Sequence, residues 1–278
     1  MLATLVIVFR EVIEAGLIVG IVLAATKGVP QRTLWVCGGV AAGVLGACAV
    51  ALFAAQIAGL FEGSGQEIFN AGILLAAVLM LIWHNTWMAS HGQIIAQEIR
   101  AVGGAVAAGR RPLTALAIVV GVAVLREGSE IVLFLLGIAS ASGESAWAMF
   151  SGAALGILSG AGLSAVMYYG LITIPMRSLF TVTTTLITLL AAGMASQALA
   201  FLQQAGYFAS MSEPVWNSSW LLSQDSIPGR LLHGLIGYSD SPTSAQLLAY
   251  LLTIAIILGL MRVVGLKRGL PGESLAKT

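Results

Sequence analysis

Seven long apolar segments dominate this sequence of 278 residues and restrict what it can fold into. A helix needs about 20 mostly apolar residues to cross a bilayer. The segments that meet this requirement cover about residues 3–25, 34–58, 68–88, 113–139, 147–173, 178–203 and 246–264. Hydrophobic residues make up 58% of the chain and charged residues 9%, whereas soluble domains average about 45–50% and about 25%. The composition therefore excludes a soluble enzyme. It predicts one all-α integral membrane domain, residues 1–278, with seven transmembrane helices.

Lysine and arginine are distributed unevenly between the two sides of these spans. Ten of the 13 lie in or beside the connections at about 26–33, 89–112 and 174–177 and at the C-terminus. Connections rich in Lys and Arg stay in the cytoplasm. We therefore expect a multi-pass protein of the inner (cytoplasmic) membrane, with the N-terminus out and the C-terminus in. The net charge of +1, without a basic cluster, gives no reason to expect nucleic acid.

An ionised motif occurs twice inside apolar segments. Its copies are Arg10-Glu11-x-x-Glu14 in the first segment and Arg126-Glu127-x-x-Glu130 in the fourth. The following segments also correspond, because Gly39-x-x-x-Gly43 in the second is matched by Gly152-x-x-x-Gly156 in the fifth, and such small-residue ridges allow close helix packing. Repeats of three helices enter the membrane from opposite sides, as in many transporters. We predict two inverted repeats, about 3–88 and 113–203, and a seventh helix at about 246–264.

The spacing of the motif places both of its carboxylates and its arginine on one side of a helix, because residues three and four apart are neighbours. Ionised groups in the hydrocarbon region cost at least about 2.5–3.5 kcal/mol each, which argues against a role in packing alone. Two structural Arg–Glu pairs would also leave one carboxylate per helix without a partner. Carboxylate oxygens suit hard cations. The predicted metal ligands are Glu11, Glu14, Glu127 and Glu130, with Arg10 and Arg126 balancing their charge.

Four carboxylates and two arginines sum to a formal charge of −2, which a divalent cation neutralises and a trivalent cation turns to +1. Candidate residues for the entrance of a cation are Glu67 and Glu62 at the outer end of the third segment. Candidates for its exit are His84 and His91, seven residues apart near the inner end. Each of these also has an ordinary structural interpretation, as a solvated loop acid or a hydrogen-bonded histidine. In the long connection 204–245, Ser212-Glu213-Pro214 predicts the start of an interfacial helix.

At its two motifs the sequence resembles the oxidase-dependent ferric iron permeases, the family of the fungal high-affinity iron permease and of EfeU-like bacterial proteins. The likeness extends to three further stretches, namely Gln66-Glu67-Ile68-Phe69, Ala191-Ala192-Gly193-Met194-Ala195 and Leu232-His233-Gly234-Leu235-Ile236-Gly237-Tyr238. Asn70 and Gln203-Gln204 stand where relatives tend to have acidic residues.

The resemblance implies a permease that takes up ferric iron, Fe3+, as its transported substrate, with no permanently bound cofactor. It also implies an iron-oxidising or iron-delivering partner protein in the periplasm or outside the cell. An enzyme is not expected, because the sequence contains no HExxH motif and no convincing nucleophile–base pair. The alternatives are a permease for another hard or divalent cation (ferrous iron, manganese or lead) and a seven-helix receptor.

Overall fold

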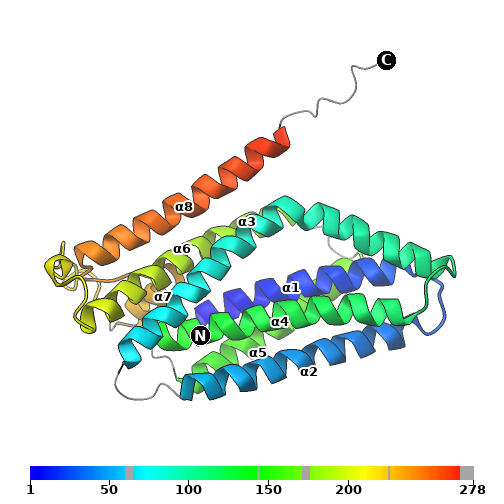
Figure 1. Cartoon of the computed structure of the whole chain (residues 1–278), viewed down its shortest axis with the longest axis horizontal. Helices are drawn as coiled ribbons and strands as arrows, with labels where there is room; N and C mark the ends of the chain where they lie inside the picture. Colours follow the sequence, from blue (N-terminus) through cyan, green and yellow to red (C-terminus); the bar gives the residue numbers. More distant parts are fainter. Residues whose placement is uncertain (60–64, 143–144, 171–175, 225, 270–278) are drawn as a thin grey trace.

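The computed structural model describes residues 1–59, 65–142, 145–170, 176–224 and 226–269, and it is a bundle of long helices (Figure 1). The helices are α1 (Leu2–Ala25), α2 (Arg32–Gly59), α3 (Gln66–Ala107), α4 (Thr114–Ser142), α5 (Ala146–Tyr168), α6 (Met176–Gln204), α7 (Ile227–Ile236) and α8 (Ser244–Gly269), with a 3-10 turn η1 (Ala209–Met211). Each of the seven predicted spans overlaps one of these long helices within the described residues. Within the described residues, β-type pairing is limited to the isolated bridge between Pro214 and Thr243.

Five of the long helices contain a stretch that is long and apolar enough to cross a membrane: α2, α3, α5, α6 and α8. The other two, α1 and α4, have 24 and 29 residues. Each of them carries the three ionisable residues of one motif within its apolar stretch, and this number of charges sets it apart from the other five. The all-helical fold class is therefore confirmed for the described residues, with five helices that could span a membrane.

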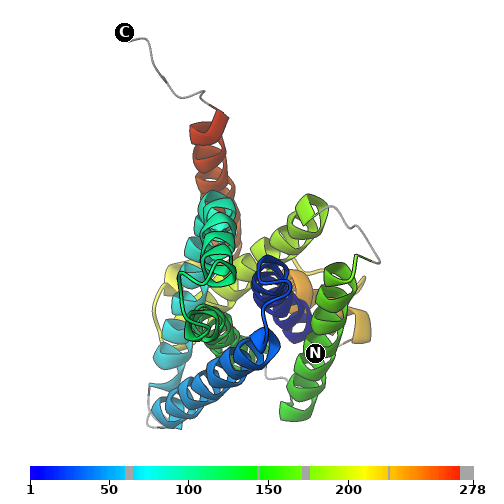
Figure 2. The same ribbon diagram turned by 90° about the vertical axis from the view of Figure 1, so that its right-hand side faces the viewer.

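Helices of one predicted repeat pack against helices of the other. The most extensive helix contacts join α1 to α5 and α2 to α4, and α3 packs against α6. Figure 2, which looks along the bundle, shows these neighbours side by side. Glycines make the close approach possible: a β-carbon on Gly39 would lie 2.6 Å from the carbonyl oxygen of Ala117, and one on Gly152 would lie 2.5 Å from that of Met1. The small-residue ridges predicted from the sequence therefore lie at the contacts of α2 with α4 and of α5 with α1.

One prediction concerns the ridge of α5. A β-carbon at Gly156 would lie 2.8 Å from Val8 Cβ and 2.9 Å from the Leu5 carbonyl oxygen. The Gly156→Ala substitution is expected to push α1 and α5 apart and to lower the free energy of unfolding by about 1–3 kcal/mol. Gly162→Ala is the matched control on the same helix, because nothing lies within 4 Å of its added β-carbon. Thermal unfolding in detergent measures both, and an equal effect of the two variants would contradict the close packing.

Helix α3 is longer than the sequence predicted. We expected a helix over 68–88 followed by a loop over 89–112, but α3 continues to Ala107 and has 42 residues. At 1.5 Å per residue it is about 63 Å long, and Figure 1 shows it changing direction part-way. Its second half is amphipathic: Ile95, Ile99 and Val106 pack with Val22 of α1 and Leu116 of α4. Polar residues on its other face made this half look like a loop.

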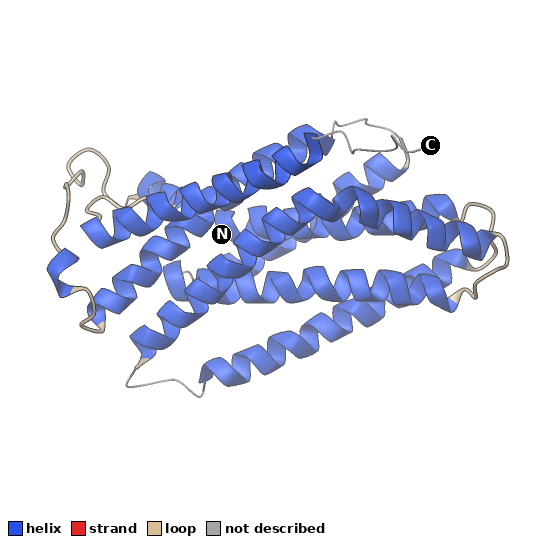
Figure 3. Cartoon of the chain, turned by 45° about the horizontal axis from the view of Figure 1, so that its top comes forward, coloured by secondary structure: helices blue, strands red, loops and turns tan. Residues whose placement is uncertain are grey.

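The connection between α6 and α8 also differs from the prediction. The stretch that begins at Ser212-Glu213-Pro214 is not helical. The helix of this region is α7, which starts after Ser226, whose side chain accepts a hydrogen bond from the Gly229 backbone N–H. Figure 3 shows the region as loops with a short helix at one end of the bundle. The predicted helix start at Pro214 is therefore wrong, and the proline in a first helical turn of this region is Pro228.

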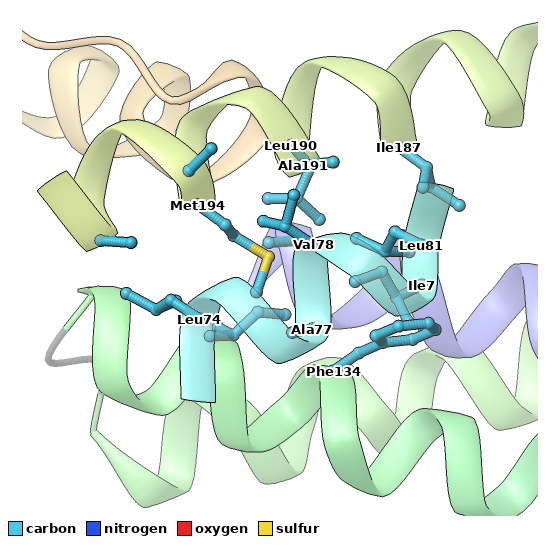
Figure 4. Close-up of a cluster of buried hydrophobic side chains, with 14 of the residues drawn as sticks. Ile7, Leu74, Ala77, Val78, Leu81, Phe134, Ile187, Leu190, Ala191 and Met194 are labelled. Carbon is cyan, nitrogen blue, oxygen red and sulfur yellow. The ribbon is translucent and has the colours of Figure 1, made fainter. Parts of the chain in front are cut away.

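Two clusters of buried apolar side chains lie near opposite ends of the bundle. One cluster lies towards the end at which α1 begins, and ten of its residues are labelled in Figure 4: Ile7, Leu74, Ala77, Val78, Leu81, Phe134, Ile187, Leu190, Ala191 and Met194. The second cluster lies towards the end at which α1 finishes and is formed by Val22, Val36, Ile99, Val106, Leu116 and Val120. The two motifs lie between these clusters along α1 and α4.

Candidate metal centre

The first motif is buried in the middle of the bundle on α1. The side chains of Arg10, Glu11 and Glu14 are 3%, 0% and 2% exposed. The Arg10 guanidinium contacts both carboxylates, with Nη1 3.2 Å from Glu11 Oε1 and Nε 3.0 Å from Glu14 Oε1. The helical spacing predicted this arrangement, because Glu14 is four residues from Arg10 and therefore lies one turn away.

The second motif repeats this pattern on α4. Arg126 Nε donates to Glu130 Oε1 at 3.2 Å and lies 3.9 Å from Glu127 Oε1. Both carboxylates are buried, but the Arg126 side chain is 30% exposed. Its guanidinium carbon lies 4.4 Å from the centre of the Trp87 ring of α3, a cation–π contact. Each arginine thus contacts both carboxylates of its own motif, but Arg10 is buried and Arg126 is partly exposed.

Each arginine contacts the Oε1 oxygen of each glutamate in its own motif. The second oxygens, Oε2, lie outside these contacts. Glu11, Glu14, Glu127 and Glu130 each have a buried Oε2 atom with no hydrogen-bond partner in the described part of the structure. Buried polar atoms nearly always have a partner, so four such carboxylate oxygens in one region need an explanation. A bound cation is the simplest group that would satisfy them.

A histidine of α3 completes this arrangement. His84 is fully buried, with Nε2 3.5 Å from Glu14 Oε2 and Nδ1 in close contact with Glu130 Oε2. Glu11, His84, Glu127 and Glu130 each offer a ligand atom, and these atoms lie within 4.8 Å of one another. Glu14 is adjacent to this group and is held by Arg10. The structure therefore brings the two predicted motifs together and adds one imidazole.

The sequence grouped His84 with His91, but the structure separates them. His91 is exposed, and its ring stacks on that of Trp87 with centroids 5.2 Å apart. The signal that would have distinguished His84 is its neighbour: His84 and Asn85 are consecutive polar residues inside an apolar span, and both are buried. Two adjacent polar residues in the hydrocarbon region point to polar groups on neighbouring helices.

Of the two candidates for the entrance, Glu67 is not part of this cluster. Glu67 lies in the first turn of α3, seventeen positions before His84, which corresponds to roughly 26 Å along the helix. Glu62 lies outside the described residues.

A bundle of membrane-length helices with buried carboxylates, guanidinium groups and an imidazole defines a multi-pass membrane protein with a candidate cation site. Comparison with known proteins identifies the family. The chain belongs to the iron permease FTR1 family, which it matches over residues 1–271. The resemblance drawn from the two motifs is therefore confirmed at the level of the family.

Individual relatives cover most of the chain. It is 32% identical over 245 residues to the "Ferrous iron permease EfeU" of Escherichia coli O157:H7, which covers 86% of this chain and 87% of the relative. It is 30% identical over 249 residues to the protein of the same name from Yersinia pestis, with 88% and 87% covered. The "Putative inactive ferrous iron permease EfeU" of Escherichia coli K12 is 31% identical over 249 residues, with 86% and 87% covered. No solved structure matches this chain significantly.

Proposed function

We propose that this protein is a permease, not an enzyme, which moves iron across the cytoplasmic membrane into the cell through the site made by its two Arg-Glu-x-x-Glu motifs. The observation that carries the proposal is the set of four motif glutamates, each with a buried oxygen that lacks a hydrogen-bond partner in the described residues. Leaving a buried carboxylate oxygen without a hydrogen bond is costly, and a cation would satisfy several of these oxygens at once. Membership of the iron permease family supports iron as that ion.

The proposed architecture is two inverted three-helix repeats and a seventh helix, all crossing the membrane, with the N-terminus out and the C-terminus in. The reciprocal packing of α1 on α5 and of α2 on α4 supports the repeats. So does the position of the site between α1 and α4, since transporters with inverted repeats bind their substrates where the repeats meet near the membrane midplane. The cost of the motif charges in α1 and α4 is offset by the ion pairs that each arginine makes.

We further propose that the site holds Fe2+. The four glutamates and two arginines sum to a formal charge of −2, which Fe2+ neutralises, and the relatives are named ferrous iron permeases. Fe3+ is the second candidate, because the resemblance implies it and because carboxylates are hard oxygen donors. If the supply outside the cell is Fe2+, transport as Fe3+ would need oxidation outside the membrane, which is the role of the iron-oxidising partner that the resemblance implies.

The test is the uptake of radioactive iron into proteoliposomes that contain the pure protein. Iron is supplied either as Fe2+ kept reduced by ascorbate or as Fe3+ citrate, with manganese as a competitor. Glu14→Gln and Glu130→Gln are each expected to lower uptake by at least about tenfold to a hundredfold, the usual effect of disturbing a metal site. Glu98→Gln, a matched change on the exposed face of α3, is expected to leave uptake unchanged.

Two results would contradict the proposal. Uptake that is equal in the wild type and in both motif variants would show that iron does not pass through this site. Uptake of neither Fe2+ nor Fe3+ by the wild type would contradict permease activity of this chain alone. A preference for Fe3+ over Fe2+ would leave the site in place and reverse the choice of ion.

A further inference from the structure

His84 belongs to neither motif, yet it lies between both. Its side chain is 0% exposed. One ring nitrogen faces Glu14 of α1 and the other faces Glu130 of α4. Neither nitrogen meets the geometry of a hydrogen bond in the described structure. A buried imidazole normally has at least one hydrogen-bonded nitrogen. The nitrogens of His84 lie against carboxylate oxygens without forming a hydrogen bond, and a bound cation would satisfy both kinds of atom.

The chemistry of the cluster gives the imidazole a specific role. A site of carboxylates alone presents only oxygen atoms, which are the preferred ligands of Mg2+ and Ca2+. Nitrogen ligands favour transition metals such as iron, nickel and zinc over these hard ions. Three carboxylates and one imidazole have ligand atoms within 4.8 Å of one another, from α1, α3 and α4. Such a mixed set distinguishes a transition metal from the common divalent ions, which a purely acidic site does not.

We propose that His84 is a direct nitrogen ligand of the transported ion and determines the specificity of the site for divalent transition metals over Mg2+ and Ca2+. This inference rests on the proposed cation site and adds a residue from α3 to it. The specificity of the site then depends on a helix outside both motifs. The motif glutamates supply the charge that attracts a cation, and His84 selects among cations of equal charge.

A spectroscopic experiment tests the ligand without any substitution. The protein is purified without a polyhistidine tag, loaded with Mn2+ and measured by electron spin-echo envelope modulation, which detects nitrogen nuclei bonded to the metal. One imidazole nitrogen is expected in the wild type, and growth with heavy-nitrogen histidine should change its frequencies. His84→Gln is expected to remove this signal, and His91→Gln, the matched change on the exposed part of α3, is expected to retain it.

The proposal fails if Mn2+ binds and the wild type shows no histidine nitrogen, or if the nitrogen signal persists in His84→Gln. Either result leaves the proposed function intact provided that Glu14→Gln and Glu130→Gln abolish binding. By contrast, if Mn2+ binding does not respond to the glutamate variants, the proposed site itself fails.

Selectivity is the second measurement. In the proteoliposome assay we measure the concentration of Ca2+ or Mg2+ that halves Fe2+ uptake. This concentration is expected to be at least about tenfold lower for His84→Gln than for the wild type, because even indirect changes at metal sites alter affinity by about 10–100-fold. His91→Gln is expected to match the wild type. A uniform loss of uptake in His84→Gln, without any change in the competition by Ca2+ and Mg2+, would assign His84 a purely structural role and overturn the proposal.

Discussion

Exchanging Arg10 for glutamine is expected to lower the free energy of unfolding by about 3–5 kcal/mol, the usual cost of removing one partner from a buried ion pair. Arg10 is 3% exposed and contacts both Glu11 and Glu14. Without it, two carboxylates remain in the centre of the bundle with no nearby guanidinium from their own helix. Thermal unfolding of the purified protein in detergent, without added metal, measures the effect.

The second motif provides a matched comparison. Arg126 occupies the corresponding position of its motif but is 30% exposed. Arg126→Gln is therefore expected to cost less, about 1–3 kcal/mol, as for the loss of a charged hydrogen bond that solvent partly replaces. Arg100→Gln on the exposed face of α3 controls for the loss of a positive charge in general. Equal destabilisation by the Arg10 and Arg126 variants would contradict the asymmetry between the motifs.

The asymmetry also bears on how a transporter of this kind works. If the two repeats are inverted copies, Arg10 and Arg126 occupy equivalent positions. Their different exposure is then an asymmetry between the two copies in this conformation. Arg10 precedes Glu14 by one turn and lies towards the end of the bundle at which α1 begins. Arg126 precedes Glu130 by one turn on the antiparallel α4 and lies towards the opposite end. Arg10 is thus enclosed more completely than Arg126, whereas the glutamates of both motifs are buried.

The sequence predicted the features that follow from local rules. Apolar segments of membrane length correspond to long helices, because segment length and composition are sufficient to recognise such helices. The four motif glutamates were predicted to be the ligands of one metal site, since ionised groups are costly in the hydrocarbon region and carboxylates suit hard cations. The structure places Glu11, Glu127 and Glu130 together as this reasoning required.

Features that depend on packing between distant segments could not be predicted in the same way. The second half of α3 contains Glu98 and Arg100 and reads as a polar loop until the partners of Ile99 and Val106 are known. His84 was predicted only as a candidate for the exit of a cation, because its place among the glutamates depends on how α3 crosses α1 and α4. No local rule fixes that crossing, whereas the helices themselves follow from local rules.

A layer of apolar side chains separates the site from the end of the bundle at which α1 begins. Each helix of the candidate site contributes one member about one turn from its site residue: Ile7 precedes Glu11, Leu81 precedes His84 and Phe134 follows Glu130. These three side chains are 0% exposed and belong to one cluster, which Figure 4 shows together with Ile187 of α6. A metal ion cannot cross this apolar layer unless its side chains rearrange, because burial of a charge among apolar groups is very costly.

Phe134→Ala is therefore expected to have two large effects. The cavity it leaves should lower the free energy of unfolding by about 3–5 kcal/mol, and water that enters it would connect the site to that side of the membrane. Proteoliposomes loaded with Mn2+ are expected to lose the ion at least about tenfold faster with this variant than with the wild type, a change of about 1.4 kcal/mol in the barrier.

Phe150→Ala on α5, where the side chain is 65% exposed, should leave both the stability and the rate of Mn2+ loss close to the wild type. If Phe134→Ala destabilises the protein but retains the wild-type rate of Mn2+ loss, this layer does not close the path, and closure must depend on the second apolar cluster, around Val22 and Leu116.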